Sequence, residues 1–471
     1  MTQYVCIHGH FYQPPREDPQ TGKIPNQPSA APFDNWNDRI LKECYMANTE
    51  VEIVDSNGEA KFLNNYDFLS FNIGPTLFSW MEEFHPLTTE RIVGSHHRSV
   101  DRTGHSNIIA QAYHHSILPL ATRYDKETEI RWGIADYKHR FGSLPEGMWL
   151  AETAVDTETL EVLAECGIRF VILAPRQAKS VQINGVWTDV NETTVDTSQP
   201  YRCVLPSSKD IALFFYEPQL AMDVAFRGAL NNGVNFASTI EQRALSLDKD
   251  RLLHFATDGE SYGHHHRHGE VALGFCLDRL QHSQVEITNY GAYLAANPPT
   301  QDAKIVERSS WSCAHGVGRW SENCGCVIDP AMKGQQEWRA DLRLVLTRLG
   351  DITRTLFMER CTSLLTDPME VRHRWKEAEL SGTEKALIRE FTHPKIKVTP
   401  KHIETVRFWM AQQELALKMF TSCGWFFDSH TGIEAQQILG YAQELIKHTR
   451  ERVDWPLSQA IKDDLTALLN D

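Results

Sequence analysis

The sequence lacks the features that would assign it to a membrane, a nucleic acid or a disulfide scaffold. Its 471 residues contain no run of 18 or more apolar residues, so we expect no membrane span. It has 62 acidic and 47 basic side chains, a formal net charge of −15, whereas nucleic-acid binding needs a basic surface. Ten cysteines are too sparse for a disulfide framework, and the N-terminus lacks the segments of an export signal. We therefore expect a cytoplasmic protein with reduced thiols and with neither a membrane nor a nucleic-acid partner.

Nucleotide-binding signals and internal repeats are also absent. No Gly-x-Gly-x-x-Gly segment and no phosphate-binding loop follows any expected strand. An apolar content of 41% with 23% charged residues is ordinary for a globular protein. The length predicts two or three domains, or one large barrel with an appendage.

Short apolar runs alternate with helical patterns through the first two-thirds of the chain, which is typical of a parallel sheet covered by helices. Residues 157–166 form an amphipathic helical pattern that Gly167 stops, directly before the next apolar run. Six or seven strands over about 260 residues favour a closed barrel over an open sheet. The expected strands are 4–8, 68–73, a weaker one near 107–110, 148–151, 170–173, 211–216 and 252–257.

The character of the sequence changes after Pro330. Segments 337–360, 401–421 and 433–452 place apolar residues at three- and four-residue spacing, which predicts long amphipathic helices packed in a bundle. We therefore predict an α/β protein with a (β/α)7 barrel over residues 1–310 and an α-helical domain over residues 311–471. The residues expected to be buried in that domain are Leu342, Leu346, Phe357, Phe408, Leu415, Met419 and Ile438.

Polar side chains gather where the expected strands end, and in a barrel those ends face one bowl. Glu152 ends a strand after Trp149, and Asp258 ends another. Each carboxylate alone is explained as a salt-bridged strand cap. Two of them across one bowl have the arrangement that glycoside hydrolysis needs, with one nucleophile and one proton donor. Other candidate substrate-binding residues at the strand ends are His8, His10, Gln13 and His264, and Trp149 and Trp311 are candidates for sugar stacking.

The histidine-rich strand ends leave a metal-based alternative open. Two or three imidazoles and an aspartate can hold zinc, but histidine also hydrogen-bonds sugar hydroxyls. A second cluster, Cys313, His315, Cys324 and Cys326, departs from the paired Cys-x-x-Cys spacing of structural zinc sites, which favours ordinary thiols. The sequence therefore predicts no metal and no cofactor.

Four motifs in order resemble glycoside hydrolase family 57, the family of α-amylases and 4-α-glucanotransferases. They are His8-Gly-His10-Phe-Tyr-Gln13-Pro14, Phe71-Asn-Ile-Gly74-Pro75, Trp149-Leu-Ala-Glu152 and Asp258-Gly-Glu260-Ser-Tyr-Gly263-His264. The segments 98–107, 145–150, 310–316 and 420–428 resemble a narrower subgroup.

The resemblance implies a barrel followed by a helical bundle, an α-glucan or oligosaccharide substrate and a retaining mechanism. It further implies Glu152 as the nucleophile and Asp258 as the acid/base. In such enzymes the two carboxyl groups lie about 5–5.5 Å apart. We also expect burial and the charge of Glu152 to raise the pKa of Asp258. A metal-dependent polysaccharide deacetylase and a non-catalytic glycan-binding barrel remain the alternatives.

Overall fold

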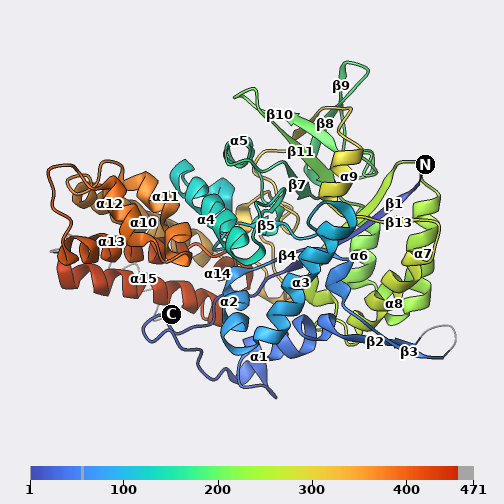
Figure 1. Cartoon of the computed structure of the whole chain (residues 1–471), viewed down its shortest axis with the longest axis horizontal. Coiled ribbons are helices and arrows are strands. Elements are labelled where there is room, and N and C mark those ends of the chain that lie inside the picture. Colours follow the sequence, from blue (N-terminus) through green and yellow to red (C-terminus); the bar gives the residue numbers. More distant parts are fainter. Residues whose placement is uncertain (1, 55–57, 454–471) are drawn as a thin grey trace.

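A closed barrel of parallel strands forms the larger part of the molecule (Figure 1). The structure, a computed structural model, describes residues 2–54 and 58–453. In order around the barrel, the strands are β12 (Leu252–Asp258), β1 (Tyr4–Phe11), β4 (Ser70–Ile73), β5 (Ala110–Gln111), β6 (Met148–Trp149), β7 (Phe170–Leu173) and β11 (Asp210–Phe215).

Backbone contacts join these strands into a ring. Parallel bridges from Phe71 to Ile108 and from Gly147 to Phe170 connect β4 to β5 and β6 to β7. The ring closes where the amide of Glu217, just after β11, donates to the carbonyl of His254 in β12 over 2.8 Å. All the expected strand segments are present, although the segments near 107–110 and at 148–151 each form a strand of only two residues, β5 and β6. This confirms the predicted fold class.

Helices connect successive strands and cover the outside of the barrel. Local sequence signals set the ends of α5. At its start the side chain of Asp156 accepts a hydrogen bond from the amide of Thr159, and just beyond its end Gly167 takes a φ of +88°. These helices are α1 (Trp36–Ile40), α2 (Pro75–Phe84), α3 (Pro86–Thr103), α4 (Arg123–Phe141), α5 (Thr157–Glu165), α6 (Pro218–Phe226), α7 (Gly233–Leu245), α8 (Gly269–Gln281) and α9 (Tyr290–Ala296).

Several short strands outside the barrel were not predicted. β8, β9 and β14 form a small antiparallel sheet that projects with β10 at one edge of the barrel (Figure 1). Every residue of β9 is exposed, so this strand has no buried face to leave an apolar alternation in the sequence. These strands are β2 (Val51–Val54), β3 (Ala60–Leu63), β8 (Ala178–Ile183), β9 (Val186–Asp189), β10 (Tyr201–Val204), β13 (Glu286–Ile287) and β14 (Ala303–Ile305).

The remaining helices lie together at the other end of the molecule (Figure 1). They are α10 (Trp338–Cys361), α11 (Pro368–Leu380), α12 (Glu384–Phe391), α13 (Pro400–Lys418), α14 (Cys423–Phe426) and α15 (Ile433–Arg452). Five of the seven side chains expected in their core are fully buried, whereas Phe408 and Leu415 are only half-buried on α13. The predicted division of the chain at residue 310 stays a prediction.

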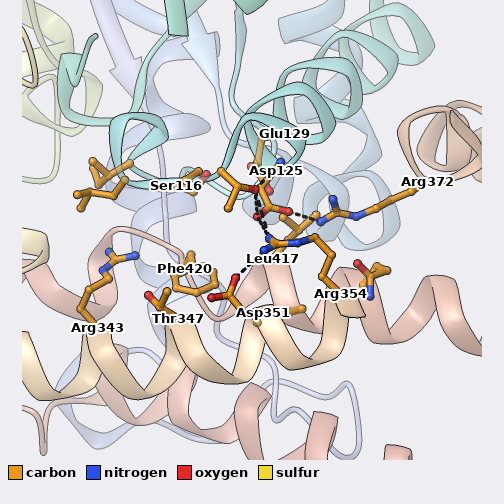
Figure 2. Close-up of a pocket in the computed structure, with 17 residues that line it drawn as sticks. Ser116, Asp125, Glu129, Arg343, Thr347, Asp351, Arg354, Arg372, Leu417 and Phe420 are labelled. Carbon is orange, nitrogen blue, oxygen red and sulfur yellow. Dashed lines mark hydrogen bonds and ion pairs between the residues drawn. The ribbon is translucent and has the colours of Figure 1, made fainter. Parts of the chain in front are cut away.

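A cluster of charged side chains, of which Arg372 is buried, joins the helical region to the barrel. Asp125 at the start of α4 faces Arg372 of α11 at 2.5 Å and Arg354 of α10 at 3.4 Å, beside a cavity of about 60 Å³ (Figure 2). Burial raises the pKa of Asp125, but the two guanidinium groups outweigh burial and lower it. Breaking such a pair leaves an uncompensated buried charge, so the cluster fixes the position of the helices.

Within the described residues, no helix is long and apolar enough to cross a membrane.

We predict that Leu346→Ala strongly destabilises the helical region. Leu346 is fully buried on α10, and truncating a buried leucine to alanine costs about 2–5 kcal/mol. Leu344→Ala is the matched control, because Leu344 lies on the same helix and is 49% exposed. Urea denaturation followed by circular dichroism should show a lower midpoint for the first variant and a change within about 0.5 kcal/mol for the second. Equal effects of both variants would contradict the packing described here.

Candidate active site

The two predicted catalytic carboxylates lie at the carboxyl ends of β6 and β12, where barrel strands direct side chains into one bowl. Asp258 is the last residue of β12 and pairs in register with His10 of β1. Glu152 follows β6 in a short 3-10 turn, Ala151–Thr153. Both residues therefore lie at the same end of the barrel, and the charge of Glu152 contributes to raising the pKa of Asp258.

Glu152 has an unusual backbone conformation. Its φ of 58° and ψ of 22° are left-handed, and Thr153 follows with a φ of 51°. Residues other than glycine adopt such angles at a cost of about 1–3 kcal/mol, and strain of this kind clusters at functional sites. The side chain of Gln177 holds the turn by donating to the Thr153 carbonyl at 2.8 Å and accepting from the Thr153 hydroxyl at 2.9 Å. The strain is therefore maintained by contacts from elsewhere in the chain.

One segment of the loop after β14 positions the Glu152 carboxylate. The indole of Trp311 donates to Oε2 at 3.0 Å, and the hydroxyl of Ser312 donates to the same oxygen at 2.5 Å. Burial is the largest effect and raises the pKa of Glu152 above its ordinary value, although these two hydrogen bonds and the positive charge of Arg319 oppose it. Trp311, Ser312 and Arg319 therefore favour the ionised form of the Glu152 carboxyl group.

Asp258 has a different environment. Its side chain keeps solvent-exposed surface at the end of β12, although many protein atoms surround it. This enclosure first, and the charge of Glu152 second, raise the pKa of Asp258 to about 7, in the direction expected from the sequence. Burial and the charge of Asp258 also raise the pKa of Glu260 to about 8. Only glycine fits at position 259 between these two residues, because a Cβ there would come within 2.5 Å of the Phe11 ring.

Stacked rings form the packed floor of the bowl. The rings of His8 and His10 stack on Trp149, with centroids 5.0 and 4.9 Å from it. All three side chains are almost wholly buried, and burial lowers the pKa of both histidines to about 3. At neutral pH they are therefore uncharged hydrogen-bonding groups. Neither His8 nor Trp149 has an exposed face in this structure.

A chain of hydrogen bonds runs from this floor to the helical region. Asn72 of β4 contacts a ring nitrogen of His10 at 2.9 Å. The other ring nitrogen of His10 lies 3.0 Å from His115, whose second nitrogen lies 2.7 Å from the hydroxyl of Ser422. The helical region therefore contacts the floor of the site and is not detached from the barrel mouth.

The remaining predicted site residues, Trp311, Gln13 and His264, differ in which carboxyl group they contact. Trp311 is half-buried and contacts Glu152 directly. Gln13 is half-buried and donates to Glu260 over 3.3 Å. His264 instead pairs with Glu43 at 2.5 Å.

Comparison with known proteins supplies the family. The sequence profile of glycosyl hydrolase family 57 matches residues 32–300, which is more than half of the chain. The chain belongs to this family. A second profile, for a domain of unknown function (DUF3536), matches residues 335–469. Family 57 membership confirms the resemblance inferred from the motifs and the predicted enzyme class, a glycoside hydrolase or a related transferase.

Known proteins of this kind resemble the chain in fold more than in sequence. A maltose-forming amylase from Pyrococcus sp. ST04 superposes with a TM-score of 0.72 at 14% identity, over 98% of this chain and 82% of the other. A branching enzyme from Thermococcus kodakaraensis gives 0.59 at 14% identity, over 100% and 95%. Alpha-amylase 1 of Dictyoglomus thermophilum is 26% identical over 113 residues, which are 24% of this chain but only 16% of that protein.

Sequence reasoning missed several residues that contact the candidate site or support it. Ser312 could have been inferred, since it directly follows the candidate Trp311. Arg319 and Gln177 have no local signal, because their relation to Glu152 exists only through tertiary contacts. His115 was visible only as one of a histidine pair, His114–His115.

The loop after β12 does not assemble the metal site that the histidine-rich alternative requires. His264 pairs with Glu43, and His266 lies 3.2 Å from the carbonyl of Ala225. Among the residues that the structure describes, the one group of three or more metal-ligating side chains that converge is Cys313, His315, Cys324 and Cys326.

Proposed function

We propose that the protein is a retaining glycoside hydrolase or transglycosylase that acts on α-glucans. The observation that carries the proposal is the contrast between two neighbouring carboxyl groups. Burial first, and the charge of Glu152 second, raise the pKa of Asp258 to about 7, whereas the Glu152 carboxylate accepts two hydrogen bonds. Pairs of titratable groups in such different environments are typical of acid and nucleophile assignments.

In the first step, Glu152 attacks the anomeric carbon and the glycosidic C–O bond breaks. Asp258 gives its proton to the departing oxygen, which leaves a covalent glycosyl-enzyme and an ionised Asp258. In the second step, Asp258 takes a proton from water or from a sugar hydroxyl, whose oxygen attacks the same carbon and releases Glu152. The predicted short carboxylate separation, about 5–5.5 Å and up to about 7 Å without substrate, stays a prediction.

The α-glucan substrate is proposed from the named relatives, which include a maltose-forming amylase, a 4-alpha-glucanotransferase from Thermococcus litoralis and a branching enzyme. We propose that Trp311 and Gln13, which keep exposed surface beside the carboxylates, contact the sugar. We propose that His8, His10 and Trp149, which are almost wholly buried, support the site rather than contact the sugar.

We predict that Glu152→Ala lowers kcat at least about 10³-fold on the preferred substrate, because the covalent step then has no nucleophile. The substrate is found by screening maltooligosaccharides, glycogen and mannosides. Azide should partly restore turnover and yield a glycosyl azide, since this small anion fits the space left by the side chain. Glu165→Gln, on the surface of α5, is the control and should keep wild-type activity. Turnover of mannosides alone, or full activity of Glu152→Ala, would contradict the proposal.

We also predict a basic limb near pH 7 in the profile of kcat/KM. The acid must carry its proton in the free enzyme, so activity should be constant just below the pKa of Asp258 and fall as pH rises through about 7. Glu260 has a raised pKa as well, so the isosteric Glu260→Gln is the matched control and should leave the limb in place. A profile that stays flat to about pH 9, or a limb that disappears in Glu260→Gln, would show that Asp258 is not the acid.

A further inference from the structure

Four side chains that are dispersed over 14 residues converge between the barrel and the helical region. The Sγ atoms of Cys324 and Cys326 each lie 3.8 Å from that of Cys313. Nδ1 of His315 lies 3.6 Å from Sγ of Cys326, and all four ligand atoms lie within 4.8 Å of one another. The sulfurs are far beyond the length of a disulfide bond, about 2.05 Å.

These distances match a tetrahedral zinc site. Zinc with Zn–S bonds of about 2.3 Å and a Zn–N bond of about 2.0–2.1 Å holds its sulfurs about 3.8 Å apart and its nitrogen about 3.5 Å from each sulfur. Three thiolates and one imidazole also form a donor set that favours zinc over magnesium or calcium, which prefer oxygen ligands. The spacing is Cys-x-His followed by Cys-x-Cys, which explains why a search for Cys-x-x-Cys pairs disfavours the metal.

We infer that Cys313, His315, Cys324 and Cys326 bind one structural zinc ion. All four positions of the tetrahedron are filled by protein, and catalytic zinc sites keep one position open. With three thiolates the occupied site has one net negative charge. Arg339, which is fully buried on α10, donates to the carbonyl of Cys326 at 2.8 Å and lies 3.7 Å from Asp428. These contacts tie the site to the helical region.

The zinc ion would stabilise the segment that positions Glu152. Between Trp311 and Cys326 the chain has one 3-10 turn, Gly318–Trp320, and no strand or longer helix, so regular backbone bonding contributes little to its order. Cys313 directly follows Trp311 and Ser312, the two donors to Glu152. The metal is therefore a positioning element for the carboxylate and takes no part in the reaction itself. This consequence rests on the proposed function, whereas the metal site does not.

The test measures metal in the full-length protein, independently of activity. Protein purified in the presence of zinc and then freed of loosely bound ions should contain about one zinc per chain by mass spectrometry. Cys324→Ser and Cys326→Ser should each lose most of it. Cys166→Ser is the matched control, since Cys166 is a half-buried thiol outside the cluster, and should retain it. Zinc-free wild-type protein, or unchanged zinc in Cys326→Ser, would overturn the inference.

A second measurement uses the unmodified protein in case a variant fails to fold. Cobalt should replace zinc and give the absorption bands of a tetrahedral thiolate complex. Removing the metal with a chelator should increase hydrogen exchange in residues 311–326 and leave the barrel strand β12 protected. A cobalt spectrum without thiolate bands, exchange that does not respond to the chelator, or a disulfide within the cluster would contradict the zinc site.

Discussion

Enclosing several carboxyl groups at one end of a barrel is the constraint on which the rest of this structure depends. Two nearby carboxylates repel each other, and burial penalises the charged form of each. Burial raises the pKa of Asp258, Glu260 and Glu152. Only Glu152 has two hydrogen-bond donors and a guanidinium group, that of Arg319, that together oppose this effect. The proposed first step requires a proton on Asp258 and an ionised Glu152, and the donors around Glu152 favour its ionised form.

The parts that maintain this inequality come from distant regions of the chain. The left-handed turn at Glu152 is held by Gln177, and its carboxylate by Trp311 and Ser312. The helical region reaches the floor through Ser422 and His115. Barrel, loop and helices therefore act as one support for the site, and the proposed zinc ion would anchor the loop where barrel and helices meet.

The sequence predicts the barrel well because its strands are buried on both faces and leave continuous apolar runs. It also predicts that Glu152 and Asp258 lie at strand ends on the same side of the barrel, as the structure has them, since strand ends in a barrel converge by geometry. It does not predict β9, which has no buried face, or the left-handed backbone of Glu152, which follows from tertiary contacts. The sequence also does not predict that Cys313 and Cys324 lie close together, because an irregular loop leaves no periodic pattern of apolar residues from which its path could be inferred.

The central claim, a covalent intermediate on Glu152, is tested most directly by trapping it. In Asp258→Ala, α-maltosyl fluoride should still react, because fluoride leaves without protonation, but the second step lacks its base. Mass spectrometry of the digested protein should then show one maltosyl group on the peptide that contains Glu152, with about one equivalent of fluoride released. Sustained fluoride release without an adduct, or an adduct on another residue, would contradict the mechanism.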